Sequence, residues 1–228
     1  MVAFNKYRIK QRLKPSRSLN KRQALKMVEA SYLAAATALI WIALYYLPIG
    51  GAIFRLSVPL PLALLQLRRG FKSGLEGVIL CTFLLTALMG PLRGPLFLFP
   101  YGLLSLWLGL SWYKKLSWWF SWGIGALIGT LGFLVRVIVL SFLVGENLWV
   151  IITRAAASLL EKSIDFLGLP FSPGISEVQV VAICLVIVQE VVYVLCLHAL
   201  AFWIFPRLRA SMPEPPDPLK AFISLDPL

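Results

Sequence analysis

The segment MVEASYLAAATALIWIALYYL, residues 27–47, sets the class of this protein, because it is apolar over the length of a membrane span. A transmembrane helix needs about 20 mainly apolar residues. Within the segment, Ala30, Ala34 and Ala38 stand four residues apart, so on a helix their small side chains form one row. In lipid, such rows let helix backbones pack closely. We therefore expect a membrane helix whose alanine row docks on a helix of a partner protein.

The composition of the whole chain agrees with a membrane protein. Hydrophobic residues make up 59% of the 228 residues and charged residues only 14%, whereas charged residues are about 25% of soluble domains. Five further apolar segments predict spans, and the first of them carries Pro59 and Pro61, which should kink it. These segments are residues 52–67, 74–90, 95–112, 119–145 and 178–205.

The longest connection, residues 146–177, separates the last two predicted spans. Its part 147–167 is amphipathic, with apolar Ile151 and Leu159 set against charged Arg154 and Glu161, which predicts a helix lying on the membrane surface. The predicted fold class is therefore all-α integral membrane. It is a bundle of about six transmembrane helices with an amphipathic surface helix between the fifth and the sixth.

The net charge of +12 comes mainly from the N-terminal tail, which has nine Lys and Arg and no acidic residue before residue 27. Ahead of a span, such a tail is a topology signal and binds anionic lipid headgroups. With the N-terminus inside, inner segments hold seventeen Lys and Arg and outer segments three. We expect a basic tail (1–26), a six-helix membrane domain (27–209) and a proline-rich tail (210–228). Both tails should be cytoplasmic or stromal, in a plasma or thylakoid membrane.

Several activities are not expected from this sequence. The basic tail lacks the interleaved aromatic residues of a nucleic-acid module, so no nucleic-acid partner is expected. The chain shows no common hydrolase or nucleotide-binding motif, and Gly125 and Gly129 form a GxxxG packing pattern within a span. The single histidine, His198, is read as a hydrogen-bonded packing residue. We expect no enzyme activity, no metal and no cofactor.

Two charges inside predicted spans point to a binding site. Arg136 and Glu190 would each cost about 2.5 to 3.5 kcal/mol in hydrocarbon, so each should face the protein interior. They could form an ion pair that joins the fifth and sixth spans, or they could line a polar pocket open to the outer side. Arg55 is expected to reach the headgroups from the second span. The candidate ligand-binding residues are Arg136, Gln189, Glu190, Gln179, Tyr193, Glu146, Asn147 and Trp149.

Four segments carry a resemblance to a known family: LPIGGAIFRLSVPLPLALLQLRRG (47–70), LMGPLRGPLFLFPYGLLSLWLG (88–109), GTLGFLVRVIVLSFLVGENLW (129–149) and LHALAFW (197–203). They resemble the YybS-like uncharacterised integral membrane family, in its cyanobacterial and chloroplast branch. The resemblance covers about residues 29–218. That family is grouped in fold with the substrate-binding S-components of energy-coupling-factor (ECF) vitamin transporters.

The resemblance implies a helical bundle that binds a small solute from the outer side. It also implies that the row Ala30, Ala34 and Ala38 docks on a transmembrane coupling subunit that carries two ATPases. The same fold group contains MreD-like proteins, which scaffold other machinery. The alternative expectation is therefore a non-transporting scaffold or assembly factor for a photosynthetic or envelope membrane complex.

Overall fold

The computed structural model describes residues 21–48, 50–168 and 174–223, and every regular element in these ranges is a helix. Most of the predicted basic tail, residues 1–20, lies outside the described part of the chain. The elements are α2 (Lys21–Tyr46), α3 (Gly51–Ser57), α4 (Leu60–Arg69), α5 (Phe71–Met89), the short 3-10 helix η1 (Pro95–Leu98), α6 (Tyr101–Tyr113), α7 (Trp118–Val144), α8 (Leu148–Leu167), α9 (Ile175–Arg207) and α10 (Asp217–Ile223).

Five helical segments in the described residues are long and apolar enough to cross a membrane. They agree closely with five of the six predicted spans, which confirms a multipass all-helical membrane architecture. The five segments are Gln23–Tyr46, Phe71–Met89, Pro95–Tyr113, Trp118–Val144 and Ile175–Arg207.

The predicted second span, residues 52–67, is two short helices and not one kinked helix. Helix α3 ends where Val58 donates its N–H to the Phe54 carbonyl at 3.0 Å, and α4 begins at Leu60. Pro59 and Pro61 have no backbone N–H, so the hydrogen-bond ladder cannot continue through them. The two prolines therefore break the segment where the sequence predicted only a bend.

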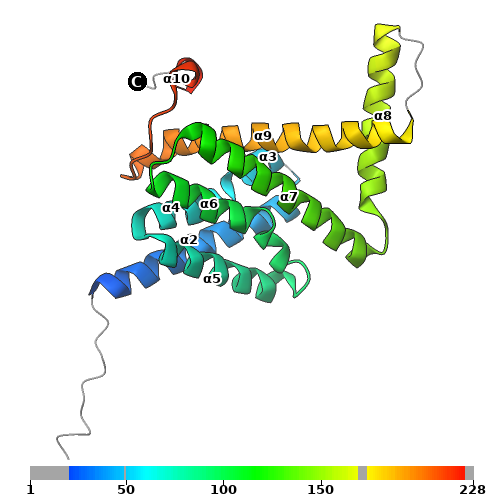
Figure 1. The fold of residues 1–228 in the computed structure, drawn as a ribbon. Helices are drawn as coiled ribbons and strands as arrows, with labels where there is room; N and C mark the ends of the chain where they lie inside the picture. Colours follow the sequence, from blue (N-terminus) through cyan, green and yellow to red (C-terminus); the bar gives the residue numbers. More distant parts are fainter. Residues whose placement is uncertain (1–20, 49, 169–173, 224–228) are drawn as a thin grey trace, which may run out of the picture.

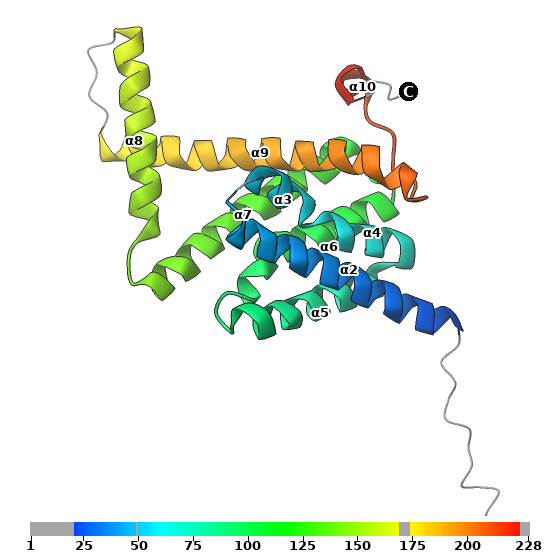
Figure 2. The same cartoon turned by 180° about the vertical axis from the view of Figure 1, so that it is seen from behind.

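The α3–α4 pair nevertheless runs back along α2 from one end of the bundle to the other. At the far end of α4, Arg68 and Arg69 both form ion pairs with Glu29, near the start of α2. Arg68 also donates to the carbonyl of Leu208, just after α9. The start of α2 and the end of α9 therefore lie at the same end of the bundle (Figures 1 and 2). We call this the basic end, and the other the α8 end.

Helix α4 occupies the centre of the bundle, where it packs on α2, α5 and α6. Its Gln66 is buried and donates to the Leu106 carbonyl at 3.0 Å. Glycines on both neighbours make room for Gln66: a Cβ at Gly74 would lie 2.6 Å from its Oε1, and one at Gly109 would lie 2.8 Å from its Cβ. Close backbone approach at small residues is the usual way to pack helices in lipid.

The alanine row of α2 packs inside this bundle, which corrects the expectation that it is a docking face. Ala30 and Ala34 are 2% exposed and Ala38 is fully buried, because α2 packs on α4 and α5 there. A row of small residues serves contacts within a chain as well as contacts between chains. The sequence pattern identified a close helix contact correctly and assigned it to the wrong neighbour.

Helix α8 occupies the position of the predicted amphipathic helix. Asn147 caps it, its side-chain oxygen accepting from the Trp149 N–H at 3.1 Å. Figures 1 and 2 both show α8 lying crosswise to the long helix α9, at the end of the bundle away from the start of α2 and the end of α9. Its Ala156 and Ile164 are buried, and α8 packs mainly on α9. This orientation agrees with a helix that lies along a membrane surface.

The predicted proline-rich tail packs at the basic end and then forms a short helix. Ala210 is buried, and the Trp118 indole donates to the Pro213 carbonyl at 3.0 Å. Beyond this contact the chain forms α10. The described part of the tail is therefore partly packed on the bundle.

Candidate functional site

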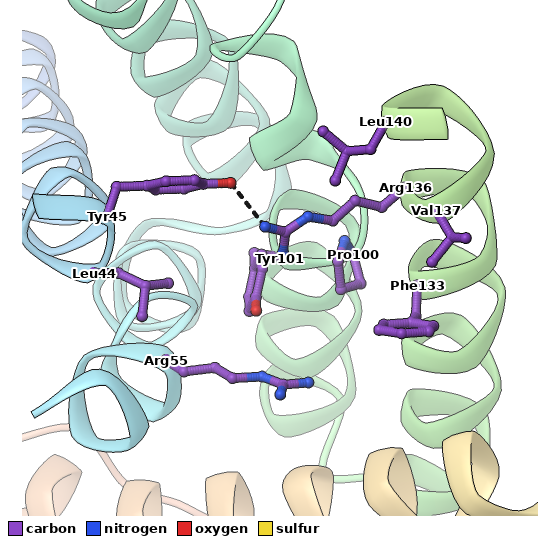
Figure 3. Close-up of a pocket in the computed structure, with 9 residues that line it drawn as sticks. All are labelled: Leu44, Tyr45, Arg55, Pro100, Tyr101, Phe133, Arg136, Val137 and Leu140. Atoms are coloured by element: carbon purple, nitrogen blue, oxygen red, sulfur yellow. Dashed lines mark hydrogen bonds between the residues drawn. The ribbon is translucent and has the colours of Figure 1, made fainter. Parts of the chain in front are cut away.

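A cavity of about 390 Å³ lies toward the α8 end, between α2, α3, α6 and α7. Figure 3 shows two arginine side chains entering it from opposite sides, Arg55 from α3 and Arg136 from α7, with Tyr101 between them. The remaining lining is mostly apolar. The lining residues are Leu44, Tyr45, Arg55, Pro100, Tyr101, Phe133, Arg136, Val137 and Leu140.

The break between α3 and α4 holds Arg55 in place. In a continuous helix the backbone N–H of residue 59 would donate to the carbonyl of Arg55, but Pro59 has no N–H. The hydroxyl of Tyr193 on α9 donates to that carbonyl instead, at 2.9 Å. An unsatisfied carbonyl costs several kcal/mol in a membrane interior, on the order of the transfer cost of an amide. Tyr193 therefore ties the broken segment to α9.

The side chain of Arg55 is neutralised by groups on α9. Its Nη2 forms an ion pair with Glu190 Oε1 at 2.9 Å, and its guanidinium lies 5.0 Å from the centre of the Tyr193 ring. The Gln189 amide oxygen, in the orientation that satisfies both amide atoms, accepts from Nη1 and Nη2 at 3.2 and 2.8 Å. The Arg55 side chain is 33% exposed and the Glu190 side chain is fully buried. The pair therefore presents its positive partner to the cavity.

Two glycines of α7 let α9 approach closely enough for this pairing. A Cβ at Gly129 would lie 2.6 Å from Glu190 Oε2, and a Cβ at Gly125 would lie 2.9 Å from Val194 Cγ1. The predicted role of the GxxxG pattern in helix packing is thus confirmed. Glu190 Oε2 accepts no hydrogen bond from the part of the chain that the structure describes. The carboxylate is therefore committed to Arg55 through its other oxygen.

Arg136 has different surroundings from Arg55. Its Nη2 donates to the Tyr45 hydroxyl at 2.7 Å, and its guanidinium lies 5.5 Å from the Trp41 ring centre and 6.0 Å from that of Tyr45. No described carboxylate forms an ion pair with it. The predicted ion pair between Arg136 and Glu190 is absent, because the Glu190 carboxylate forms an ion pair with Arg55 instead. The expectation that Arg55 extends to the headgroups is wrong for the same reason.

The cavity therefore has an excess of one positive charge, since two guanidinium groups face a single carboxylate. Charges interact more strongly in a poorly hydrated site than in water. A guanidinium group offers paired N–H donors whose geometry matches a carboxylate or phosphate. The chemistry of the cavity is that of an anion receptor with an apolar wall.

The predicted site divides into two places in the structure. We call the cavity that Arg55 and Arg136 enter the arginine cavity. Arg136 lines it, whereas Gln189, Glu190 and Tyr193 do not line it and contact Arg55 instead. The other four predicted residues lie around α8. Asn147, Trp149 and Gln179 line a separate cavity of about 490 Å³ between α8 and α9, and Glu146 lies with Asn147 and Trp149 in a surface hollow beside the end of α7.

Sequence reasoning missed four polar or shape-defining residues of the cavity: Arg55, Tyr45, Tyr101 and Pro100. Arg55 could have been found, because it precedes Pro59 by four residues and is a charge within an apolar segment. The tyrosines gave no signal of their own, since aromatic residues are frequent throughout the membrane domain.

His198 is a packing residue, as predicted. Its Nδ1 donates to the Val194 carbonyl at 2.9 Å, so its Nε2 is free to accept from the Ser121 hydroxyl at 2.9 Å. The rings of Trp112 and Trp118 lie 5.4 and 5.3 Å from it. Both ring nitrogens of His198 make hydrogen bonds within the bundle, so the residue has a structural role.

Comparison with known proteins places most of the membrane domain in one family. No curated protein and no solved structure matches the chain. The model of a family described as "Predicted membrane protein (DUF2232)" matches residues 34–220, which include every residue of the arginine cavity. The match covers most of the 228 residues. The chain therefore belongs to the DUF2232 family of predicted membrane proteins.

Proposed function

We propose that this protein is a membrane-embedded binding subunit whose Arg55–Arg136 cavity takes a small organic anion. One observation carries the proposal: Arg136 faces the cavity without a carboxylate partner among the described residues, while Arg55 is already paired with Glu190. A charge at membrane depth is costly and marks functional pathways in membrane proteins. An anionic ligand would supply the missing counter-charge.

The shape and lining of the cavity narrow the ligand class. Its volume of about 390 Å³ lies in the usual range for small-molecule sites, about 300 to 1,000 Å³. The apolar wall comes from two sides, Leu44 on α2 and Phe133 and Leu140 on α7, and the two arginines enter from opposite sides. A carboxylic acid with an apolar body satisfies both features. The carboxylate would bind Arg136, and the apolar body would contact the wall.

The resemblance to YybS-like proteins and to S-components extends this proposal to transport. Counting α3–α4 as one crossing gives six crossings, with both ends of the described bundle on one side. If the basic end is cytoplasmic or stromal, the cavity lies toward the outer face, where an S-component receives its solute. The sequence has no P-loop, so transport would need a coupling subunit with ATPases. That subunit would contact a surface other than the buried alanine row.

The binding proposal is tested with the full chain in lipid nanodiscs. We expect a panel of apolar carboxylates to raise its thermal unfolding temperature, and the matching amides and alcohols to leave it unchanged. Arg136→Gln should abolish the shift, and Arg93→Gln, which removes an exposed arginine outside the cavity, should keep it. An equal response of the two variants, or equal shifts with neutral analogues, would contradict the proposal.

A second candidate function is a scaffold or assembly factor. Exposed apolar side chains on α8 and at the start of α9 favour it. Phe166 on α8 is 91% exposed and Ile175 on α9 is 81% exposed, at the α8 end of the bundle. Crosslinking in the native membrane, followed by purification, separates the two functions. A coupling subunit and ATPases recovered with the chain support transport, and components of a photosynthetic or envelope complex support the scaffold.

A further inference from the structure

Two adjoining cavities at the basic end have no role in the anion proposal. The first is a groove of about 420 Å³ between α2, α4 and α9. Its walls are almost wholly apolar until they reach Glu29 and Arg68 at one end. The apolar side chains that matter here are Leu33, Ala36, Ile40, Leu60, Leu64 and Phe205.

The length of the groove matches one leaflet of a membrane. Its lining follows α2 from Glu29 to Ile40, eleven steps along the helix, or about 16 Å at the helical rise of 1.5 Å per residue. The hydrocarbon core is about 30 Å thick, so one leaflet contributes about 15 Å. The polar end of the groove is at the basic end of the bundle, which is where a headgroup would lie if the acyl chain followed the groove.

The second cavity, of about 480 Å³, continues from that polar end. It shares Glu29 and Arg68 with the groove and adds Arg69 and Arg209. Glu29 pairs with Arg68 and with Arg69, so one carboxylate faces three guanidinium groups. The side chain of Arg209 makes no hydrogen bond or ion pair that involves another described residue. The cavity therefore has a net positive charge and a free cation.

The backbone after α9 fixes the position of Arg209. Its φ of 57° lies in the left-handed region, which favours glycine. The turn is closed by hydrogen bonds from the Arg209 N–H to the Pro206 carbonyl at 3.0 Å and from the Ala210 N–H to the Phe205 carbonyl at 2.9 Å. Phe205 also lines the groove. The same turn thus joins the apolar groove to the basic cavity.

We propose that these two cavities form one site for an anionic phospholipid of the adjacent leaflet. One acyl chain lies in the groove between α2, α4 and α9, and the phosphate binds between Arg69 and Arg209. The apolar groove of leaflet length selects a lipid, and the excess of arginine selects a negative headgroup. The proposal is independent of the organic-anion site, because the two sites share no residue.

The test measures retained lipid by native mass spectrometry of the full chain, taken from nanodiscs of equal parts phosphatidylglycerol and phosphatidylcholine. We expect phosphatidylglycerol to be retained preferentially. Arg209→Gln should weaken its binding about fivefold, the effect of one basic residue near an anionic surface. Arg207→Gln removes an arginine from the same turn that does not line either cavity, and it should behave as wild type.

A second pair of variants tests the groove without changing charge. Ala36→Phe fills it, and Leu39→Phe enlarges an exposed side chain of α2 that does not line the groove. We expect only Ala36→Phe to release phosphatidylglycerol, and we expect inorganic phosphate at millimolar concentration not to displace it. Equal retention of both lipids, or equal loss from Arg209→Gln and Arg207→Gln, would overturn the proposal. Displacement by inorganic phosphate would overturn it in favour of a free-anion site.

Discussion

Helices pack against one another in two different ways in this protein: around α4, and at the junction of α3, α7 and α9. Around α4 the contact surfaces are small and uncharged, and Gly74 and Gly109 bring backbones against Gln66. At the junction, a proline break, two arginines and a buried glutamate surround a cavity. In the first region glycines bring helix backbones into direct contact on the α5 and α6 sides of α4, and the second region keeps a cavity at the cost of buried charge. Stability and binding should therefore respond to different substitutions.

The largest loss of stability should follow Gly109→Leu. A Cβ at this position would lie 2.8 Å from Gln66 Cβ and 3.0 Å from the Ala63 carbonyl oxygen, which belongs to the backbone and cannot rotate away. We expect the free energy of unfolding to fall by about 3 kcal/mol or more. Reversible unfolding in mixed micelles, followed by tryptophan fluorescence, measures this change.

The matched control for that variant is Gly123→Leu, because nothing lies within 4 Å of a Cβ there. Replacing an open helical glycine should be neutral or stabilising by up to about 1 kcal/mol. A similar loss in both variants would show that the packing around α4 is no tighter than elsewhere.

Ala34→Leu should also destabilise the chain, by about 1 to 3 kcal/mol, since Ala34 is 2% exposed between α2 and its neighbours. Ser31→Leu, at an exposed position one residue beyond Ala30, should have little effect. Thermal unfolding of the two variants compares them directly. A stable Ala34→Leu variant that loses only a partner protein would restore the docking role of the alanine row.

Tyr193→Phe should lower the free energy of unfolding by about 1 to 3 kcal/mol, because it leaves the Arg55 carbonyl without a donor inside the bundle. Tyr113→Phe, on an exposed ring, is the control. The same unfolding assay applies. If Tyr193→Phe is as stable as wild type, water or another group satisfies the carbonyl at the break, and Tyr193 is not needed to hold α3.

The clearest change in binding should follow Glu190→Gln. The amide still accepts a hydrogen bond from Arg55, but the guanidinium loses its carboxylate partner. The cavity then faces two uncompensated guanidinium groups, and the carboxylate ligand should bind several-fold more tightly. Isothermal titration measures the affinity, and weaker binding would show that Glu190 contacts the ligand favourably.

The same contrast explains what could be predicted from the sequence. Apolar runs define helices by length, so the predicted span 119–145 and the observed α7, Trp118–Val144, agree within one residue at each end. The alanine row identified a close contact, but its neighbours are α4 and α5, and no local pattern distinguishes an internal contact from an external one. Long apolar helices are therefore predictable, and the choice of neighbour is not.

The candidate site was predicted in part, for a related reason. Arg136, Glu190 and Tyr193 were identified because polar groups at membrane depth must face the interior. The predicted partner of Glu190 was Arg136, and the observed partner is Arg55. Arg55 lies 135 positions from Glu190 in the sequence, in a segment that Pro59 breaks. Pairing between distant segments depends on which helix ends meet, and that is a property of the complete bundle.

The ion pair between Arg55 and Glu190 has a consequence for how the protein is made. At about 5 to 20 residues per second, a ribosome adds the intervening 135 residues in roughly 7 to 27 s. During that interval α3 has no carboxylate from α9 and its Arg55 carbonyl has no donor from Tyr193, whereas α2, α4, α5 and α6 can already pack together. We expect α3 to remain at the membrane surface until α9 is inserted. The arginine cavity would then be the last part of the membrane domain to form.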